Sequence, residues 1–287
     1  MKSFLRLLCL TMLTTSAWSE NMILKDGKTI AAKTLRRQGD SVFATIDLPI
    51  SEIGKPPKTA EIGHPVDKIE KIEFVEPPIL KTAPDMIAQG NAAKVLAELE
   101  PPLKFQEGFA EIAGSFWTEL ALIKVQALVA LQREAEAEPL AKQVSKITKD
   151  AETVRAANAQ IAACLLRRGQ HSQALELSDS VLRDARGDAT LATASVTKGL
   201  CLLDRKDWEG ALLAFLAVPV FHPDQKILLV PSMLGAGRSY FGIEDFKRAK
   251  DTLNELIKSY PSSPEAQQAK NELELIQRRE KALADPK

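Results

Sequence analysis

Aromatic side chains make up only 5% of this 287-residue sequence, and it has three cysteines and three histidines. Its 38 basic and 38 acidic residues cancel, and no block of lysines or arginines stands out. The electrostatic footprint of a nucleic-acid-binding protein is therefore missing. His64, His171 and His222 have no ligand partner at metal spacing, which argues against a zinc site. No nucleophile elbow appears, so we expect no catalytic residues and no cofactor.

The composition is otherwise that of a soluble globular protein, with 45% hydrophobic and 26% charged residues. The chain is long enough for one large domain or two ordinary ones. Alanine and leucine are plentiful, and both lose little entropy on entering a helix. The composition therefore favours helices.

Residues 1–19 have the pattern of an export signal, with a basic start, a short apolar centre, and Ala17 and Ser19 just before Glu20. The apolar run is shorter than the ~20 residues that span a membrane. Cys9 follows leucines rather than small residues, so the pattern does not indicate a lipoprotein. We expect an exported, periplasmic protein with no integral membrane segment after cleavage. The alternative is an N-terminal anchor that is never cut.

Residues 20–78 are predicted to form a small β module. The segment LKDGK places an Asp26-Gly27 turn between two strands, and a second turn at Gly39-Asp40 precedes alternating apolar residues. Four or five short strands in this segment predict a strongly bent antiparallel sheet or barrel. With LKDGK and a late V-x-x-I strand, the module resembles the SH3-like or Sm-like barrels. The alternative is a simple meander packed on the next domain.

From residue 79 to 287 the pattern is helical, because apolar residues recur at i, i+3, i+4 and i+7. Short polar or proline-containing segments interrupt the pattern and separate helices of roughly 12–16 residues. These breaks are 89–91, 101–102, 167–170, 204–207 and 242–245.

Three stretches of this region share an internal pattern of a small residue, a large residue three positions later and an alanine twelve positions later. The stretches are Ala162, Leu165 and Ala174; Gly199, Leu202 and Ala211; and Gly237, Tyr240 and Ala249. A weaker copy runs from Val125 through Leu128 to Ala137. The copies start at 125, 162, 199 and 237, so they are 37, 37 and 38 residues apart.

This pattern, closed by Pro223 and Pro261, resembles the tetratricopeptide repeat. The small residue lets a second helix approach closely, the alanine is its counterpart, and the proline ends the second helix. The resemblance implies a mainly α protein, a right-handed α-solenoid of helix pairs. We also expect a further helix pair at 85–100 as a degenerate first repeat, and a capping helix that begins after Ser263. Because the usual period is ~34, we expect linkers three or four residues longer.

The glycines Gly235, Gly237 and Gly242 raise the alternative of a phosphate-binding loop. Such a fingerprint must follow a strand and open a helix, and the preceding KILLVPSML could mimic a strand. The repeat, however, also explains the tyrosine, alanine and proline that follow. We therefore expect Gly237 inside a helix, facing its partner helix. We expect Gly242 at the turn, where a positive φ is often needed.

Two further pairs of residues occupy equivalent repeat positions. Cys164 and Cys201 would lie about 9–10 Å apart on neighbouring helices, beyond the ~7 Å that a disulfide allows. We expect two buried free thiols, with one disulfide as the alternative. Asp207 and Asp245 are expected to cap second helices, and the alternative is an acid–base pair.

Stacked helix pairs form a concave surface suited to gripping an extended segment or a helix. The inward positions are predicted to bind a partner protein or peptide, and the alternative is that they are core. They are Leu166, Arg167, Val196, Leu200, Leu203, Leu234, Arg238 and Phe241.

Three functions follow from this surface. The first is a non-enzymatic scaffold or adaptor in a bacterial periplasm or envelope, and the Y-P-x-S-P-E-A link resembles periplasmic repeat proteins of the Tol–Pal and outer-membrane-assembly systems. The second is a structural component of an envelope secretion or assembly machine. The third is a glycan- or peptide-processing enzyme, for which no cluster of acidic or nucleophilic residues appears.

Overall fold

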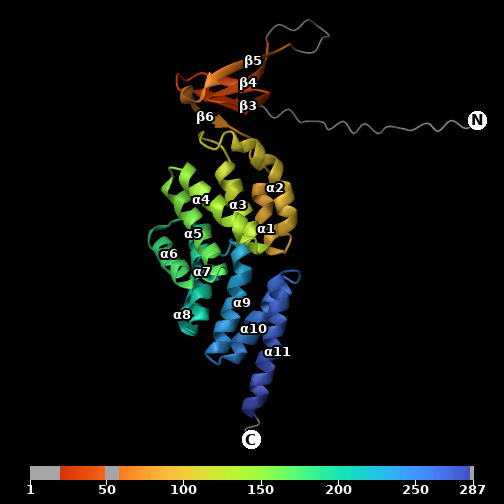
Figure 1. Ribbon diagram of the computed structural model, residues 1–287. Coiled ribbons are helices and arrows are strands. Elements are labelled where there is room, and N and C mark those ends of the chain that lie inside the picture. Colours follow the sequence, from red (N-terminus) through yellow and green to blue (C-terminus); the bar gives the residue numbers. More distant parts are fainter. Residues whose placement is uncertain (1–19, 49–57, 285–287) are drawn as a thin grey trace, which may run out of the picture. The chain divides into compact units, whose positions relative to one another are not determined.

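The computed structural model describes residues 20–48 and 58–284, and the expected export signal at 1–19 lies outside them. The described residues form two compact units, one of them a small antiparallel β unit and the other helical (Figure 1). The expected class, a mainly α protein with a small β module, is confirmed. Within the described residues, the β unit is 20–75 with 112–114, and the helical unit is 76–111 with 115–284.

The β unit contains two three-stranded antiparallel sheets, with strand orders β2-β1-β6 and β3-β4-β5. Both expected hairpins are present, and Gly27 takes a φ of +85° in the first of them. Six strands replace the four or five expected. The strands are β1 (Glu20–Leu24), β2 (Thr29–Ala32), β3 (Thr34–Gln38), β4 (Ser41–Asp47), β5 (Thr59–Pro65) and β6 (Ile69–Glu73).

The core of the β unit is built by alternation along β1, β4 and β6. Met22, Val42, Ala44 and Ile72 are fully buried, since successive strand side chains point to opposite faces. Gly114 takes a φ of +90°, and an added Cβ would lie 2.0 Å from the Ile72 carbonyl oxygen. The segment 112–114 can approach β6 because this position is glycine.

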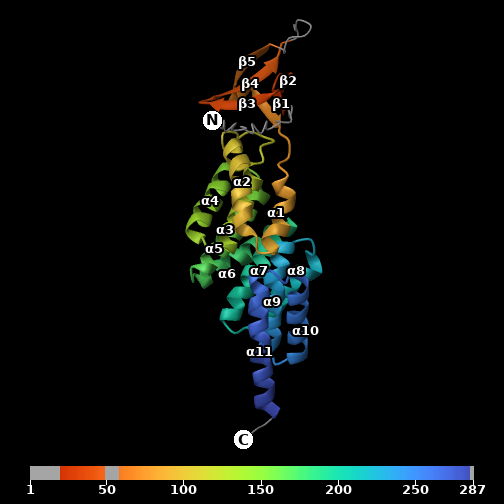
Figure 2. The same ribbon diagram turned by 90° about the vertical axis from the view of Figure 1, so that its right-hand side faces the viewer.

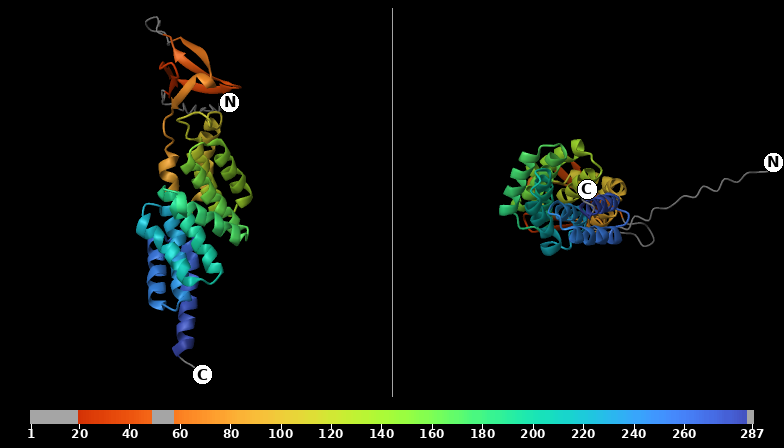
Figure 3. Two further views of the ribbon diagram at one scale, coloured as in Figure 1. Left: turned by 90° about the vertical axis from the view of Figure 1, so that its left-hand side faces the viewer. Right: turned by 90° about the horizontal axis from the view of Figure 1, so that it is seen from below.

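The helical unit is a succession of helix pairs that follow a curved path, as the view from below shows (Figure 3). Eleven α-helices lie in its described residues. They are α1 (Ile79–Ala88), α2 (Ala92–Glu107), α3 (Trp117–Ala130), α4 (Glu134–Ile147), α5 (Ala151–Arg167), α6 (His171–Asp184), α7 (Asp188–Asp204), α8 (Trp208–Phe221), α9 (Lys226–Gly242), α10 (Phe246–Ser259) and α11 (Pro264–Ala284).

The long repeat period comes from the helices and not from the linkers. The first helices α5, α7 and α9 have 17 residues, whereas α3 and all the second helices from α4 to α10 have 14. From α3 onward the linkers have only three or four residues. The expectation of longer linkers is therefore wrong. Roughly one added turn, about 3.6 residues, lengthens the first helices α5, α7 and α9 instead.

The predicted break at 101–102 is also wrong, because Pro101 and Pro102 lie inside α2. Val95, Leu99 and Leu103 are buried at four-residue spacing through this segment, so one apolar face continues past the prolines. Each proline removes one helical hydrogen bond. The carbonyls that lose a donor belong to exposed residues 97 and 98 and can face water. Burial of the apolar face outweighs the two lost bonds.

Glycines let the paired helices approach closely. Gly237 lies inside α9, where an added Cβ would sit 2.6 Å from the Leu253 side chain of α10. Gly199 in α7 makes the same approach to Phe215 of α8, at 2.8 Å. The three glycines of the phosphate-loop alternative, Gly235, Gly237 and Gly242, all lie within α9 and not at a turn from strand to helix, so that alternative does not describe them. The matching alanines Ala162, Ala174, Ala211 and Ala249 are fully buried, and Pro223 and Pro261 lie in the linkers after α8 and α10.

The expectation for Gly242 needs correction. Gly242 is the last residue of α9 and has no positive φ; that conformation falls on Glu244, at 62°, and on Lys206 at the same place in the preceding turn, at 59°. An added Cβ on Gly242 would lie 2.3 Å from the Trp208 ring. Close contact with α8, and not backbone conformation, makes glycine necessary here.

Three side chains cap helices as the sequence indicates. Asp207 accepts a hydrogen bond from the Gly210 backbone N–H, and Asp245 accepts one from that of Arg248. Ser263 accepts one from the Ala266 backbone N–H at the start of α11. Since a carboxylate at a helix N-terminus also favours the helix dipole, the two aspartates act as caps.

Cys164 and Cys201 are buried, and burial raises the pKa of the first thiol to about 12 and of the second to about 11. Only the thiolate reacts with thiol reagents. In a chain that starts at Glu20, we expect no labelling of the folded protein near pH 8 and two labelled thiols after unfolding in urea. Mass spectrometry measures this, and rapid labelling of the native protein would contradict the burial.

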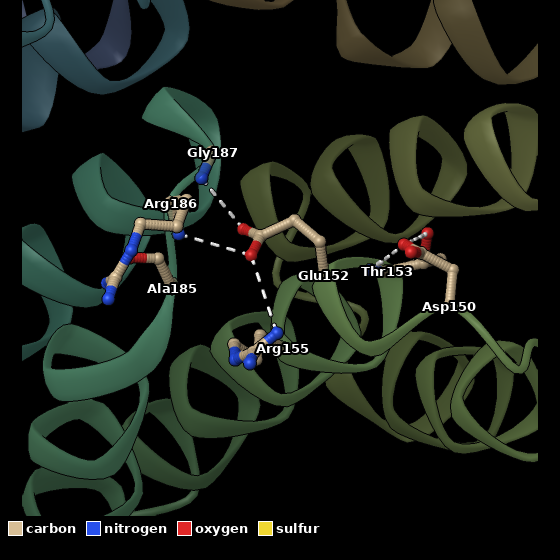
Figure 4. A network of polar contacts seen from close by, with 7 residues as sticks. All are labelled: Asp150, Glu152, Thr153, Arg155, Ala185, Arg186 and Gly187. Carbon is tan, nitrogen blue, oxygen red and sulfur yellow. Dashed lines mark hydrogen bonds and ion pairs between the residues drawn. The ribbon is translucent and has the colours of Figure 1, made fainter.

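Glu152, in the first turn of α5, holds the linker that precedes α7 (Figure 4). Its carboxylate accepts hydrogen bonds from the backbone N–H groups of Arg186, at 3.1 Å, and Gly187, at 2.8 Å. Arg155 lies 3.6 Å from the same carboxylate. Glu152 thus connects one first helix to the start of the next.

Replacing Glu152 with alanine is expected to lower the free energy of unfolding by about 1–3 kcal/mol, because two linker N–H groups lose a charged acceptor. Glu152→Gln keeps one acceptor oxygen and should lose less. Urea unfolding followed by circular dichroism measures both. An alanine variant as stable as the wild type would contradict this role.

Candidate binding surface on the first helices

The concave surface of the helical unit is lined by α3, α5, α7 and α9. Two other helices of the same chain, α1 and α11, pack against α9 at the edges of this surface. Helix α1 lies beside α9 (Figure 2), and Ala88 of α1 packs in one apolar cluster with Val230 and Leu234 of α9. Lys226 at the start of α9 forms an ion pair with Asp85 of α1, at 2.9 Å. Helix α11 packs along α9 and α10 on the other side. The concave surface is therefore flanked on several sides by helices.

A groove of about 610 Å³, called here the outer groove, lies between the ends of α5, α7 and α9 and the first half of α11. Seven of the eight predicted residues line it, and the eighth, Val196, lines the neighbouring inner cavity. The seven are Leu166, Arg167, Leu200, Leu203, Leu234, Arg238 and Phe241.

These residues differ in exposure. Leu166, Leu200, Leu203 and Phe241 are half-buried, and Arg167 is exposed. Val196 and Leu234 are only 6% and 5% exposed, so these two also belong to the core. The half-buried leucines present apolar surface that neighbouring elements do not cover completely.

Charges of both signs surround the outer groove. Arg238 forms an ion pair with Glu272 of α11, at 2.7 Å, and donates a hydrogen bond to Gln268. Arg167 makes no ion pair or hydrogen bond within the part of the chain that the structure describes. Arg167 is thus a guanidinium available to a ligand, whereas Arg238 holds α11 in place.

His171, which was not among the predicted groove residues, also lines this groove. Its Nδ1 lies 3.2 Å from the Asp204 carboxylate, but the two atoms do not meet in hydrogen-bond geometry. His171 is the first residue of α6. Its proximity to the end of α7 could not be predicted from its position in the sequence.

Two further hollows continue along the same concave surface. The inner cavity, of about 180 Å³, lies deeper between α1, α3, α5, α7 and α9. The upper hollow, of about 370 Å³, lies near the start of α3, α5 and α7. Leu166, Arg167 and Leu200 line both the outer groove and the inner cavity. Gln126, Gln160 and Thr193 line both the inner cavity and the upper hollow.

Sequence reasoning missed this deeper half of the surface. Gln160 lies seven residues before Arg167 on the same face of α5, and Thr193 lies seven before Leu200 on α7. Extending the inward positions by two helical turns would have found both. The contribution of α1 and α11 has no comparable local signal, since it depends on the curvature of the whole unit.

Among the described residues, no group of three or more histidine, cysteine, aspartate or glutamate side chains is placed to hold a metal ion. A search of the same residues finds no helix with the length and apolar character needed to cross a bilayer.

Residues 232–263 match the family model of the tetratricopeptide repeat, which spans most of α9, α10 and the linker to α11. One similar solved structure is the crystal structure of YrrB, described as a TPR protein with an unusual peptide-binding site. It is 18% identical in sequence, and the match covers 68% of this chain and 91% of YrrB, with a TM-score of 0.38. No curated protein matches this chain.

Proposed function

We propose that this protein is a non-enzymatic scaffold or adaptor that binds a segment of another protein on the concave surface of its first helices. The observation that supports this most is the outer groove, where half-buried apolar side chains from three successive first helices meet: Leu166 of α5, Leu200 and Leu203 of α7, and Phe241 of α9. Apolar residues rimmed by polar ones mark interaction sites. The tetratricopeptide match at 232–263 covers most of α9, which lines one wall of this groove, and α10, which packs against α9.

We also propose that the protein is exported and works in a bacterial periplasm or envelope, with residues 1–19 removed. The pattern of residues 1–19 supports this, and the resemblance to Tol–Pal and SH3-like or Sm-like proteins belongs to the same proposal. Edman sequencing of the protein from a periplasmic fraction is expected to start at Glu20. A cytoplasmic chain starting at Met1 would contradict it.

A second candidate function is a structural component of an envelope assembly. The outer face of α8 favours this candidate, because Leu213, Val220 and Phe221 are 73%, 64% and 70% exposed. Residues seven or eight apart lie on the same helical face. The three therefore form one apolar patch, which lines none of the three hollows.

The test of the scaffold function is crosslinking in the native envelope, followed by identification of the captured proteins. We compare the wild type with an Arg167→Glu, Leu200→Glu double variant. Arg238 is left intact because it pairs with Glu272 of α11. The matched control is Leu213→Glu, on the exposed face of α8. Loss of one specific protein from the double variant alone is expected, and an unchanged set of captured proteins would contradict the proposal.

A further inference from the structure

Two glutamine side chains on the concave surface have no hydrogen-bond partner within the part of the chain that the structure describes. Gln160 on α5 is only 6% exposed, and Gln126 on α3 is half-buried. Both line the inner cavity and the upper hollow. The side-chain nitrogen and oxygen atoms of both glutamines are open to these hollows and not sealed inside the protein, so they are available to a molecule that occupies the hollows.

The inner cavity beside these amides is mainly apolar. Ile87, Val129, Val196 and Val230 form part of its wall, and Ala163 lines it with a small side chain. Its volume is about 180 Å³. An apolar cavity of roughly 150 Å³ is large enough to hold benzene. The cavity therefore has room for one aromatic ring or one branched aliphatic side chain.

The polar groups around the cavity match a peptide main chain. A primary amide offers a donor and an acceptor side by side, as a peptide group does. Neighbouring helices pack roughly 8–10 Å apart, and an extended chain rises roughly 3.4 Å per residue. Gln126 and Gln160 can therefore reach peptide groups about three residues apart. Pro231 has no N–H, so the Ile227 carbonyl at the cavity wall lacks its usual helical donor.

We propose that the inner cavity holds one bulky apolar side chain of an extended peptide, and that Gln126 and Gln160 hydrogen-bond the main chain on either side of it. This inference rests on the proposed function and narrows the partner. A helical ligand has its main-chain groups satisfied internally, so it offers nothing to the two amides. An extended segment with a large aliphatic or aromatic anchor satisfies both the amides and the cavity.

The experiment selects phage-displayed random-sequence peptides on the immobilised full chain. The dissociation constant of a selected peptide is then measured for the wild type, Gln160→Leu and Ala163→Leu. The control is Gln173→Leu, at an exposed position on α6. Selected peptides are expected to share one large apolar residue. Gln160→Leu should weaken binding about ten-fold, Ala163→Leu should abolish it by filling the cavity, and Gln173→Leu should leave it unchanged.

The outcomes separate the two proposals. Failure to select any peptide on the wild type would contradict the scaffold function itself. Selected peptides without a shared apolar residue would contradict only the inference about the inner cavity. Equal affinity of a selected peptide for the wild type, Gln160→Leu and Ala163→Leu would also contradict only the inference about the inner cavity. Circular dichroism checks that each variant is folded, and Gln126→Leu, at a less buried position, supplies the same readout if Gln160→Leu does not fold.

Discussion

Replacing Phe215 with alanine is expected to lower the free energy of unfolding by about 3–5 kcal/mol. Phe215 of α8 is fully buried, and its ring lies against two glycines. An added Cβ would lie 2.8 Å from the ring at Gly199 on α7 and 2.3 Å from it at Gly235 on α9. The ring therefore joins three consecutive helices. Neither glycine has a side chain that could fill the space left by the ring.

Urea unfolding of the Phe215→Ala variant, followed by the helical signal in circular dichroism, measures this loss. The matched control is Phe221→Ala on the same helix, where the side chain is 70% exposed. Its free energy of unfolding should change by no more than about 0.5 kcal/mol, as expected for a surface site. Similar losses for both variants would contradict the role assigned to Phe215.

Replacing Leu200 with glutamate is expected to weaken binding of a groove ligand at least about 30-fold. Leu200 is half-buried at the junction of the outer groove and the inner cavity. Central, desolvated interface residues contribute about 2 kcal/mol or more to binding, and every 1.4 kcal/mol is about ten-fold in affinity. A carboxylate at this site also requires desolvation when the ligand covers it.

Calorimetric titration with a peptide selected on the wild type measures this effect. Leu213→Glu introduces the same charge at a position that is 73% exposed on α8, and it should bind with wild-type affinity. Equal affinities for the wild type and Leu200→Glu would exclude the outer groove as the site. Equal weakening in both variants would mean that the added charge, and not its position, reduces binding.

The helix pairs could be predicted from the sequence because their signals are local. The small residues Ala162, Gly199 and Gly237 mark the first helix of each pair. The alanine twelve positions later marks the second helix, and the recurrence of apolar residues at helical spacing supports both. Aspartates in the turns mark where second helices begin, and Asp207 and Asp245 do cap them. The predicted helix break at prolines 101–102 was wrong. Proline is locally unfavourable inside a helix, but burial of Leu99 and Leu103 keeps α2 continuous through this segment.

Other features depend on contacts distant in sequence. Strand β5 has little alternation of buried and exposed residues, so its sequence does not predict a strand. The strand is defined by its pairing with β4. The contact between α1 and α9 joins Asp85 to Lys226, which are 141 residues apart. Residues of both α1 and α9 line the inner cavity. The line of inward residues on each helix was therefore predictable, and the hollows that these residues enclose were not.

The most direct test of the concave surface is photocrosslinking from single positions in the cells that produce the protein. A photoactivatable amino acid replaces Leu203 in the outer groove of one variant and Leu213 on the outer face of α8 in another. One dominant crosslinked protein is expected from position 203, and none of that protein from position 213. A partner captured only from position 213 would contradict this expectation and would make α8 the binding surface.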